Sequence, residues 1–266
     1  MNQLFNSIRI TGVAKTIADI AGVGAPYKAE PLIDIIKNTA NQHFKGKKAD
    51  RVFMYNPDAI ALWLFQKYTA FFEKAFIRSH IQIPMLSVMP SVTPVCFASM
   101  YTGAMPSVHG IQVYEKPVLK TDTIFDAYIR AGMKPAIVST ANHSISRIFL
   151  EREMDYFIYD THEECNAKAM ELIEEDKHDL IVLYNGNYDA AMHRYGAESA
   201  EAMAGLIYNI DFYSMLIIQI EKHWAKHRTM IGFCPDHGCH EIDGNLGSHG
   251  LDIAEDMNVI HFYRFI

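Results

Sequence analysis

The sequence has few basic residues and no long apolar run. Its 24 lysines and arginines are outnumbered by 31 aspartates and glutamates, so the formal net charge is −7. Without a cluster of lysines and arginines, this acidic balance argues against a surface that tracks nucleic-acid phosphates. No stretch of 18 uncharged apolar residues is present, so we expect no segment that crosses a membrane. A neutral or anionic small molecule remains compatible with the composition if a local cation attracts it.

Cysteine is also scarce, and signals for export are lacking. The four cysteines form no C-x-x-C pair, and a disulfide framework is not expected in a chain of this size and composition. Residues 1–20 contain Arg9 and Lys15 and no compact apolar region followed by a small-residue cleavage site. We therefore expect reduced thiols and a cytoplasmic protein. The oligomeric state does not follow from the sequence.

The pattern of apolar residues indicates an α/β protein. Half of the 266 residues are hydrophobic, which suits one large domain, and no repeat or low-complexity linker divides residues 1–266. After an N-terminal helical extension over residues 1–50, strand-like and helical segments alternate. Such alternation predicts a mostly parallel central sheet covered by helices on both faces, a three-layer α/β/α sandwich. Strands are expected at 51–55, 81–88, 135–138, 180–184, 230–233 and 259–265, and the main helices at 59–76, 123–131, 163–175 and 198–226.

Three of the predicted strands are each followed by an aspartate. Asp58, Asp189 and Asp236 all lie a few residues beyond the end of a strand. Because the carboxyl ends of parallel strands meet at one edge of a sheet, we expect the three carboxylates to converge there. A single aspartate in such a position commonly caps a helix, and for Asp58 alone the cap is the simpler interpretation.

Histidines lie close to these aspartates. His193 follows Asp189 by four residues, so both side chains share a face of a helical turn and can reach one ion. The segment 233–250 is rich in glycine, which allows backbone to bend tightly around a ligand, although a flexible polar loop is the alternative. Three aspartates and three histidines predict two sites with mixed nitrogen and oxygen ligands, for which zinc fits best, ahead of manganese or iron. The predicted ligands are Asp58, Asp189, His193, Asp236, His237 and His249.

A hydroxyl group lies in the loop after another predicted strand. Thr93 follows the strand at 81–88 and precedes the segment 95–101, which can form a helix whose free N–H groups face the loop. Thr93 is therefore either a simple helix cap or a nucleophile aimed at phosphorus, with amides and metal stabilising the anion.

Three strings of residues carry a resemblance to a known family. They are PSVTPVCFASMYTGAMPSVHGI at 90–111, YDAAMHRYGAES at 188–199, and PDHGCHEID at 235–243 followed by SHG at 248–250. Together they resemble the motifs of the type I phosphodiesterase and nucleotide pyrophosphatase branch of the alkaline phosphatase superfamily. The motifs occur in the family's order over about residues 51–250.

The resemblance implies a fold, an activity and a role for each site residue. The fold would be alkaline phosphatase-like, and the protein would hydrolyse a small phosphate ester, a phosphodiester or pyrophosphate, with two divalent metal ions, most simply zinc. Two such ions lower the pKa of a threonine hydroxyl, shield the substrate's anionic oxygens and stabilise the departing alkoxide. The implied nucleophile is Thr93, with one ion on Asp189, His193 and His249 and the other on Asp58, Asp236 and His237.

The chain departs from the family pattern beside the nucleophile. Cys96 takes the place of an asparagine that the family has three residues after its threonine, and Ala59 replaces a glycine. Cys96 is a weak hydrogen-bond donor, so Asn187 or Asn185 is a candidate to hold the phosphoryl oxygen in its stead, and we expect Asn187 and Cys96 in the substrate site. The alternatives are a phosphomonoesterase or phosphonate hydrolase on the same core and, outside enzymes, a weakly active regulatory module that binds metal and phosphate.

Overall fold

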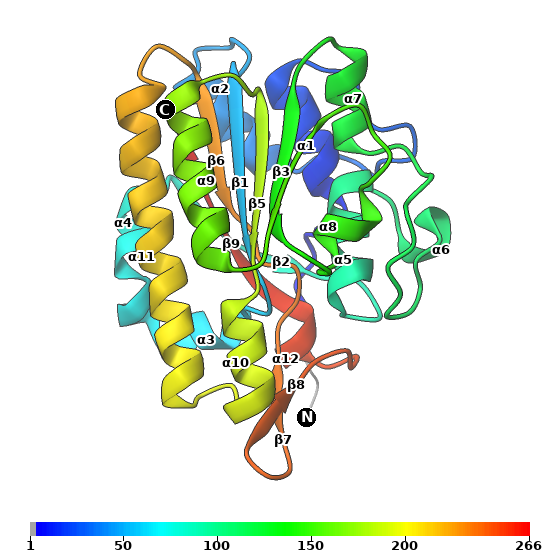
Figure 1. Cartoon of the computed structure of the whole chain (residues 1–266), viewed down its shortest axis with the longest axis vertical. Coiled ribbons are helices and arrows are strands. Elements are labelled where there is room, and N and C mark those ends of the chain that lie inside the picture. The colour runs from blue at the N-terminus through cyan, green and yellow to red at the C-terminus, as the bar shows by residue number, and fades with distance from the viewer. Residues whose placement is uncertain (1–3) are drawn as a thin grey trace.

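The computed structural model describes residues 4–266 and has a seven-stranded sheet between two layers of helices (Figure 1). The strand order is β2-β9-β6-β1-β5-β3-β4, and only β9 runs antiparallel to its neighbours. This confirms the predicted α/β/α sandwich with a mostly parallel sheet. The strands of this sheet are β1 (Arg51–Pro57), β2 (Ile81–Leu86), β3 (Pro135–Thr140), β4 (Asp155–Tyr159), β5 (Leu180–Asn185), β6 (Thr229–Phe233) and β9 (Asn258–Phe265).

Both faces of the sheet are apolar, because alternate residues of each central strand enter different cores. In β1, Val52 and Met54 pack with the layer that contains α1, α5 and α7, whereas Phe53 and Tyr55 pack with the layer that contains α9 and α11. The helices are α1 (Gly12–Ala21), α2 (Asp34–His43), α3 (Leu62–Lys67), η1 (Thr69–Phe72), α4 (Glu73–Arg78), α5 (Thr93–Thr102), α6 (Pro106–His109), α7 (Ile124–Arg130), α8 (Ile145–Ile148), α9 (His162–Glu175), α10 (Asn187–Tyr195), α11 (Ala200–His223) and α12 (Ala254–Met257).

The single helix predicted over 59–76 is wrong, because the chain forms three short helical pieces there. Tyr68 leaves the helical backbone conformation, with φ −119° and ψ 38°, and separates α3 from η1. The run from Tyr68 to Phe72 consists mainly of aromatic and β-branched residues, whose intrinsic helix propensity is low.

Two further elements are absent from the sequence prediction. The edge strand β4 has the sequence DYFIY, whose aromatic and β-branched residues favour a strand, but none of its residues is fully buried. A two-stranded ribbon, β7 (His240–Ile242) with β8 (Leu246–Ser248), lies outside the main sheet within the glycine-rich segment.

Helix α11 is long and apolar enough, by length and composition, to cross a membrane. Half of its most apolar window is buried, and side chains such as Leu206, Leu216 and Ile220 belong to one of the two cores. A core helix passes the same test of length and composition, so the packing explains the apolar character of α11.

Gly103 ends α5 in the left-handed conformation, with φ +73°, and a Cβ atom there would lie 2.5 Å from Ala29 Cβ. We expect Gly103→Ala to lower the free energy of unfolding by about 2–4 kcal/mol, from backbone strain plus overpacking. The matched control is Gly132→Ala, at φ +72° in open space, which should cost only about 1–2 kcal/mol. Urea unfolding of both variants measures the difference, and equal losses would contradict the packing described around α5.

Candidate active site

Three neighbouring strands deliver the predicted aspartates to one edge of the sheet. Strands β6, β1 and β5 are adjacent and parallel, and Asp236, Asp58 and Asp189 follow their carboxyl ends. Asp58 and Asp236 have almost no exposed surface, whereas Asp189 is half-buried in the first turn of α10. The sheet topology therefore concentrates three carboxylates in a small volume.

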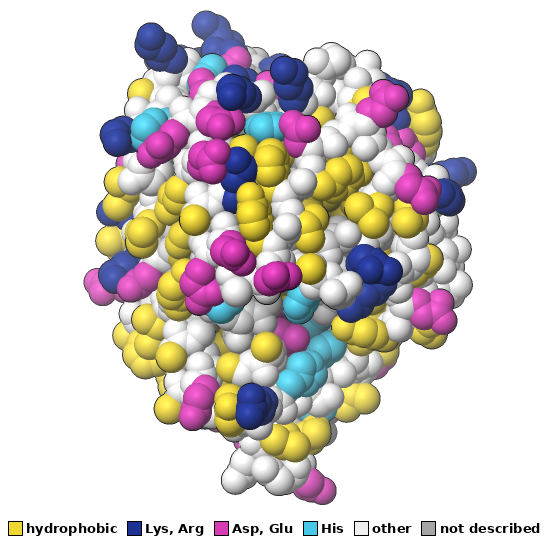
Figure 2. All heavy atoms as spheres, viewed as in Figure 1, with side chains coloured by type: hydrophobic (Ala, Val, Ile, Leu, Met, Phe, Trp, Pro, Cys, Tyr) yellow, Lys and Arg dark blue, Asp and Glu magenta, His cyan; other side chains and the backbone are white. Residues whose placement is uncertain are grey.

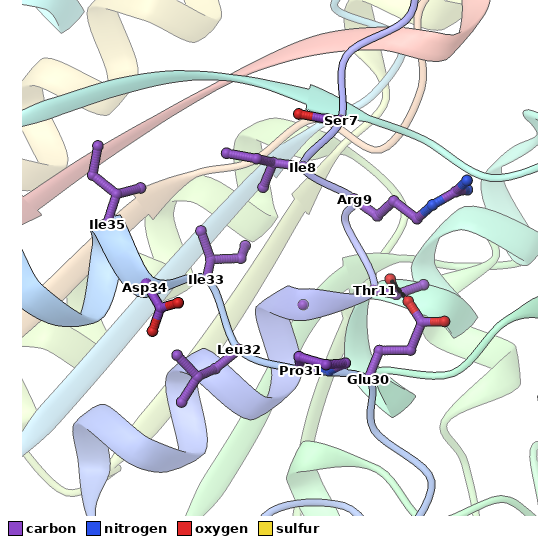
Figure 3. Close-up of a pocket in the computed structure, with 11 residues that line it drawn as sticks. Ser7, Ile8, Arg9, Thr11, Glu30, Pro31, Leu32, Ile33, Asp34 and Ile35 are labelled. Carbon is purple, nitrogen blue, oxygen red and sulfur yellow. Dashed lines mark hydrogen bonds between the residues drawn. The ribbon is translucent and has the colours of Figure 1, made fainter.

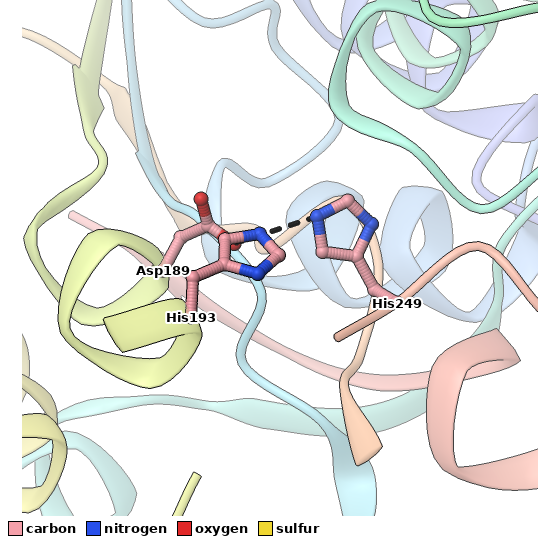
Figure 4. A group of neighbouring side chains, drawn as sticks. All are labelled: Asp189, His193 and His249. Carbon is pink, nitrogen blue, oxygen red and sulfur yellow. Dashed lines mark ion pairs between the residues drawn. The ribbon is translucent and has the colours of Figure 1, made fainter. Parts of the chain in front are cut away.

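The structure places these carboxylates with three histidines in two groups of possible metal ligands. Within each group, one ligand atom per residue lies within 4.8 Å of the others. Figure 4 shows the more accessible group, in which the His193 and His249 rings converge on Asp189 from different elements. The groups are Asp189 with His193 and His249, and Asp58 with Asp236 and His237.

Backbone carbonyls fix the orientation of all three imidazoles. Nδ1 of His193, His237 and His249 lies 2.9–3.1 Å from a carbonyl oxygen, that of Gly247, Gly238 and Ser91 respectively. A carbonyl oxygen only accepts hydrogen bonds, so each Nδ1 carries a proton, and Nε2 is the atom that can bind a metal ion once it is unprotonated. Each Nε2 lies 3.3–3.6 Å from a carboxylate oxygen of its own group. Metal-binding histidines are commonly oriented in this way.

The deeper group has the properties expected of a cation site. Asp58 Oδ1 and both carboxylate oxygens of Asp236 are buried without any hydrogen-bond partner within residues 4–266. Burial, and then the charge of Asp189, raises the pKa of Asp58 to about 6. Burial and the charge of Asp58 likewise hold the pKa of Asp236 well above its usual range. A bound divalent cation would satisfy these oxygens, so the residues fit a metal ion.

The outer group has a different charge balance. Burial favours the neutral form of Asp189, but the hydrogen bond and charge of His193, with the charges of His249 and His237, outweigh it and lower the pKa of Asp189. The same contact raises the pKa of His193 to about 9. Burial, followed by the charge of His237, lowers the pKa of His249 to about 3. Before any metal binds, His193 is therefore the main cation of this group.

Thr93 lies against the deeper group. Its Oγ1 is 3.2 Å from His237 Nε2 and 3.4 Å from Asp58 Oδ2, and only 5% of the residue is exposed. Thr93 is the first residue of α5, but this helix end offers fewer free N–H groups than the sequence suggests. Pro94 has none, and those of Val95 and Cys96 donate to the Val92 carbonyl, which leaves the N–H of Thr93 itself.

The two residues expected in the substrate site occupy different surroundings. Cys96 Sγ is buried 3.1 Å from Ser87 Oγ and 3.9 Å from the Val88 carbonyl, so its contacts are to the loop that precedes Thr93. Asn187 begins α10, two residues before Asp189, and its Oδ1 accepts a hydrogen bond from Asn209. The Asn187 side-chain amide donates to no partner within residues 4–266, and Asn187 lines a cleft together with His143 and Gly186.

Ala59, which takes the place of a family glycine, has a backbone φ of +63°. This is the left-handed region that glycine occupies without strain. The turn after Asp58 therefore keeps the glycine conformation although the glycine itself is absent.

Comparison with known proteins agrees with the motifs. Residues 56–128, about a quarter of the chain, match the model of the family described as type I phosphodiesterase / nucleotide pyrophosphatase. The resemblance inferred from the sequence is thereby confirmed. This matched segment contains Asp58 and Thr93. No curated protein matches the chain in sequence.

Solved structures show the same fold at low identity. Phosphonoacetate hydrolase from Sinorhizobium meliloti 1021, in complex with phosphonoformate, is 19% identical with a TM-score of 0.55 over 76% of this chain and 61% of that one. Human ectonucleotide pyrophosphatase / phosphodiesterase 5 is 19% identical with a TM-score of 0.56, over 73% and 58%. The murine protein, an inactive variant in complex with AMP, is 16% identical with a TM-score of 0.57, over 73% of this chain and 59% of that one. The chain thus spans about three fifths of the length of these relatives.

Two positioning residues are missing from the sequence prediction. The Tyr184 hydroxyl, at the end of β5, donates to Asp58 Oδ2 at 2.6 Å. Asp256, in α12, is fully buried and contacts both loops that carry histidine ligands. Its backbone carbonyl accepts from Gly238 N, one carboxylate oxygen lies 2.7 Å from His240 Nδ1, and the other accepts from Leu251 N. Neither residue lies in a motif, so the sequence carries no signal for these contacts.

The surface over the site carries the histidines, whereas a second hollow lies elsewhere. In Figure 2, cyan histidine side chains line a depression above β8, with acidic atoms inside it. The hollow in Figure 3, of about 400 Å³, lies between the segment before α1 and the segment that leads into α2. No predicted site residue lines it, and there the Thr11 hydroxyl donates to Glu30 at 2.5 Å.

Metal binding should release protons and strengthen as the pH rises. The pKa of His193 is raised to about 9 and that of Asp58 to about 6 in the metal-free site, and a ligand must lose its proton before it binds. Since the pKa of Asp236 is raised as well, we expect zinc binding at pH 7.5 to release at least one proton, and the affinity to rise between pH 6 and pH 9. Calorimetry in buffers of different ionisation enthalpy measures both quantities. Binding without proton release and without pH dependence would contradict the assigned ligands.

Asp236→Asn should stabilise the metal-free protein near neutral pH. The folded-state pKa of Asp236 is raised, so the fold loses stability as the pH rises above the unfolded value of about 4. We expect a gain of about 1–3 kcal/mol at pH 7.5, seen as a higher melting temperature, which shrinks toward pH 4. The control, Asp243→Asn on the exposed ribbon turn, should change nothing. Added zinc should stabilise the wild type more than Asp236→Asn, and the reverse order would contradict the site.

Proposed function

We propose that the protein is a metal-dependent phosphoric ester hydrolase with Thr93 as its nucleophile and two divalent ions, most simply zinc, on the two ligand groups. The observation that carries the proposal is the contact of the Thr93 hydroxyl with both Asp58 and His237, beside buried carboxylates that lack partners. Val92, and not Thr93, is the N-cap residue of α5, and within residues 4–266 the Thr93 hydroxyl contacts Asp58 and His237 and no backbone N–H.

The residues of the chain prepare Thr93 for attack on phosphorus. His237 and Asp58 hold Thr93 Oγ1 against the deeper ligand group. The Tyr184 hydroxyl fixes Asp58 by donating to Oδ2, the oxygen that Thr93 also contacts. The N–H of Thr93 has no acceptor among residues 4–266, so it can donate to a phosphoryl oxygen of the substrate. When bound, two divalent ions supply a lowered pKa for the hydroxyl, shielding of the phosphoryl oxygens and stabilisation of the leaving alkoxide.

The reaction balances as two displacements. In the first, a bond forms between Thr93 Oγ1 and phosphorus, the P–O bond to the leaving group breaks, and the threonine proton leaves with the alcohol product. In the second, water attacks phosphorus from the opposite side and Thr93 Oγ1 leaves as a hydroxyl. The fixed imidazole orientations hold the ligand groups in place through both steps.

Phosphodiesters and pyrophosphates are the proposed substrates, in keeping with the family that residues 56–128 match. A phosphonate hydrolase is the second candidate, favoured by the fold shared with phosphonoacetate hydrolase. A binding module that retains metals with little activity is the candidate outside enzymes, because Cys96 contacts Ser87 and replaces the family asparagine.

Thr93→Ala tests the proposal. We expect the purified wild type to bind about two equivalents of zinc and to turn over an activated phosphodiester. The variant should lose turnover by at least about a hundredfold, because the nucleophile is gone. A panel of bis-aryl phosphate, aryl phosphate, aryl phosphonate and aryl sulfate esters identifies the preferred bond.

The metal content of the variant provides the control. Thr93 is not among the assigned ligands, so Thr93→Ala should retain both zinc equivalents by elemental analysis. Unchanged turnover in this variant would overturn the proposed nucleophile. A wild type that binds metal and phosphate but hydrolyses no ester in the panel would favour the binding module.

A further inference from the structure

A group of cationic side chains lies beside the metal-ligand groups. Lys116 comes from the segment between α6 and α7, and Arg147 comes from α8. Lys116 Nζ donates to the Asn142 backbone carbonyl at 2.9 Å, and Arg147 Nη1 donates to Asn142 Oδ1 at 3.3 Å. Two cations from different segments are thus held on the same residue. In Figure 2, dark-blue side chains gather over α8, directly beside the cyan histidines.

This cationic pair is connected to the proposed reaction centre through two aromatic side chains. His143, which follows Asn142, has Nδ1 3.1 Å from the Tyr184 hydroxyl oxygen. That hydroxyl gives its own proton to Asp58 Oδ2, so His143 Nδ1 is the donor in this contact. His143 also lines a cleft of about 370 Å³ together with Gly186 and Asn187, which lead into α10 and Asp189. A series of contacts therefore leads from Asn142, which holds both cations, through His143 and Tyr184 to Asp58 beside Thr93.

Neither cation is neutralised by the protein. Within residues 4–266, Lys116 and Arg147 form no ion pair, whereas the nearby Lys120 pairs with Glu151 and Arg152 pairs with Asp126. Lys116 is half-buried, and its burial, together with the charge of Arg147, lowers its pKa despite the opposing charge of Asp58. Two neighbouring cations without a counter-ion attract an anion.

The acidic side chains of the same cleft lie beyond the end of another strand. Asp160 and Glu163 follow β4, the edge strand, whereas Lys116 and Arg147 meet at Asn142, after β3. Because β3 lies between β4 and the strands that carry the aspartates, the cations are closer to the reaction centre in the sheet order. The charge distribution thus directs an anionic group toward Asn142 and away from the end of β4.

We infer that Lys116 and Arg147 form a binding site for a second anionic group of the substrate, a carboxylate or phosphate, next to the phosphoryl group at Thr93. The inference rests on the proposed function and narrows it to phosphate esters, anhydrides or phosphonates that carry a further negative charge. A lysine supplies a point charge and an arginine a planar pair of donors, which together suit either anion.

Matched substrates test this site. Methyl 4-nitrophenyl phosphate and carboxymethyl 4-nitrophenyl phosphate release the same product and differ only by the carboxylate, and a third ester with a terminal phosphate on its arm compares the two anions. We expect Lys116→Gln and Arg147→Gln each to raise KM for the doubly anionic esters roughly tenfold, with kcat retained and the methyl ester unaffected. Lys116→Arg should recover most of the loss.

The control variant is Lys134→Gln, an exposed lysine directly before β3, at the opposite edge of the sheet. This variant should leave KM and kcat for all three esters unchanged. Equal losses toward the methyl and carboxymethyl esters in Lys116→Gln, or no loss toward either, would overturn the inference while the hydrolase stands.

Binding decides the inference independently of turnover. If the metal-loaded wild type hydrolyses none of the esters, the proposed function fails, and calorimetry then compares carboxymethylphosphonate with methylphosphonate. The inference predicts that carboxymethylphosphonate, which carries the additional carboxylate, binds at least tenfold more tightly than methylphosphonate to the wild type and that Lys116→Gln removes the difference. Equal affinity of the wild type for the two compounds would overturn it.

Discussion

Three carboxylates converge at the end of three adjacent strands, and the rest of the site follows from their mutual repulsion. Burial raises the pKa of both Asp58 and Asp236, and the charge of Asp189 adds to this effect at Asp58, as that of Asp58 does at Asp236. Within the described residues, His193 is the main compensating cation of the outer group. Buried carboxylates without partners lower the stability of the folded protein. The binding of cations to these oxygens is therefore favourable, because the other side chains do not neutralise them.

The scaffold meets this repulsion by holding the surrounding loops through backbone contacts. Carbonyl groups orient the three imidazoles, and Asp256 connects the loop after β6 to the loop after β8. Gly238 is needed for this connection, since a Cβ there would lie 2.0 Å from the Glu255 carbonyl oxygen. The two ligand groups are therefore positioned by a shared framework and not by independent loops. Lys116 and Arg147, which meet at Asn142, come from segments outside this framework.

The sequence predicts the parts of this architecture that depend on periodicity and on local spacing. The short, continuous apolar runs that form the buried strands and the i, i+4 pair of Asp189 and His193 are local patterns, so the sheet and the placement of the aspartates follow from them. The break at Tyr68 and the edge strand β4 depend on weak local preferences that tertiary packing decides. Tyr184 and Asp256 act through contacts between residues distant in sequence, for which a single sequence carries no signal.

The proposed reaction depends on attack of Thr93 Oγ1 on phosphorus beside the deeper ligand group. Mass spectrometry of the protein after acid quenching during turnover of an activated phosphodiester tests this attack directly. We expect a phosphoryl-containing adduct confined to the peptide that carries Thr93, present only in metal-loaded protein and lost after the substrate is consumed. Steady turnover with no adduct on that peptide at any quench time, together with an adduct on another residue, would contradict it.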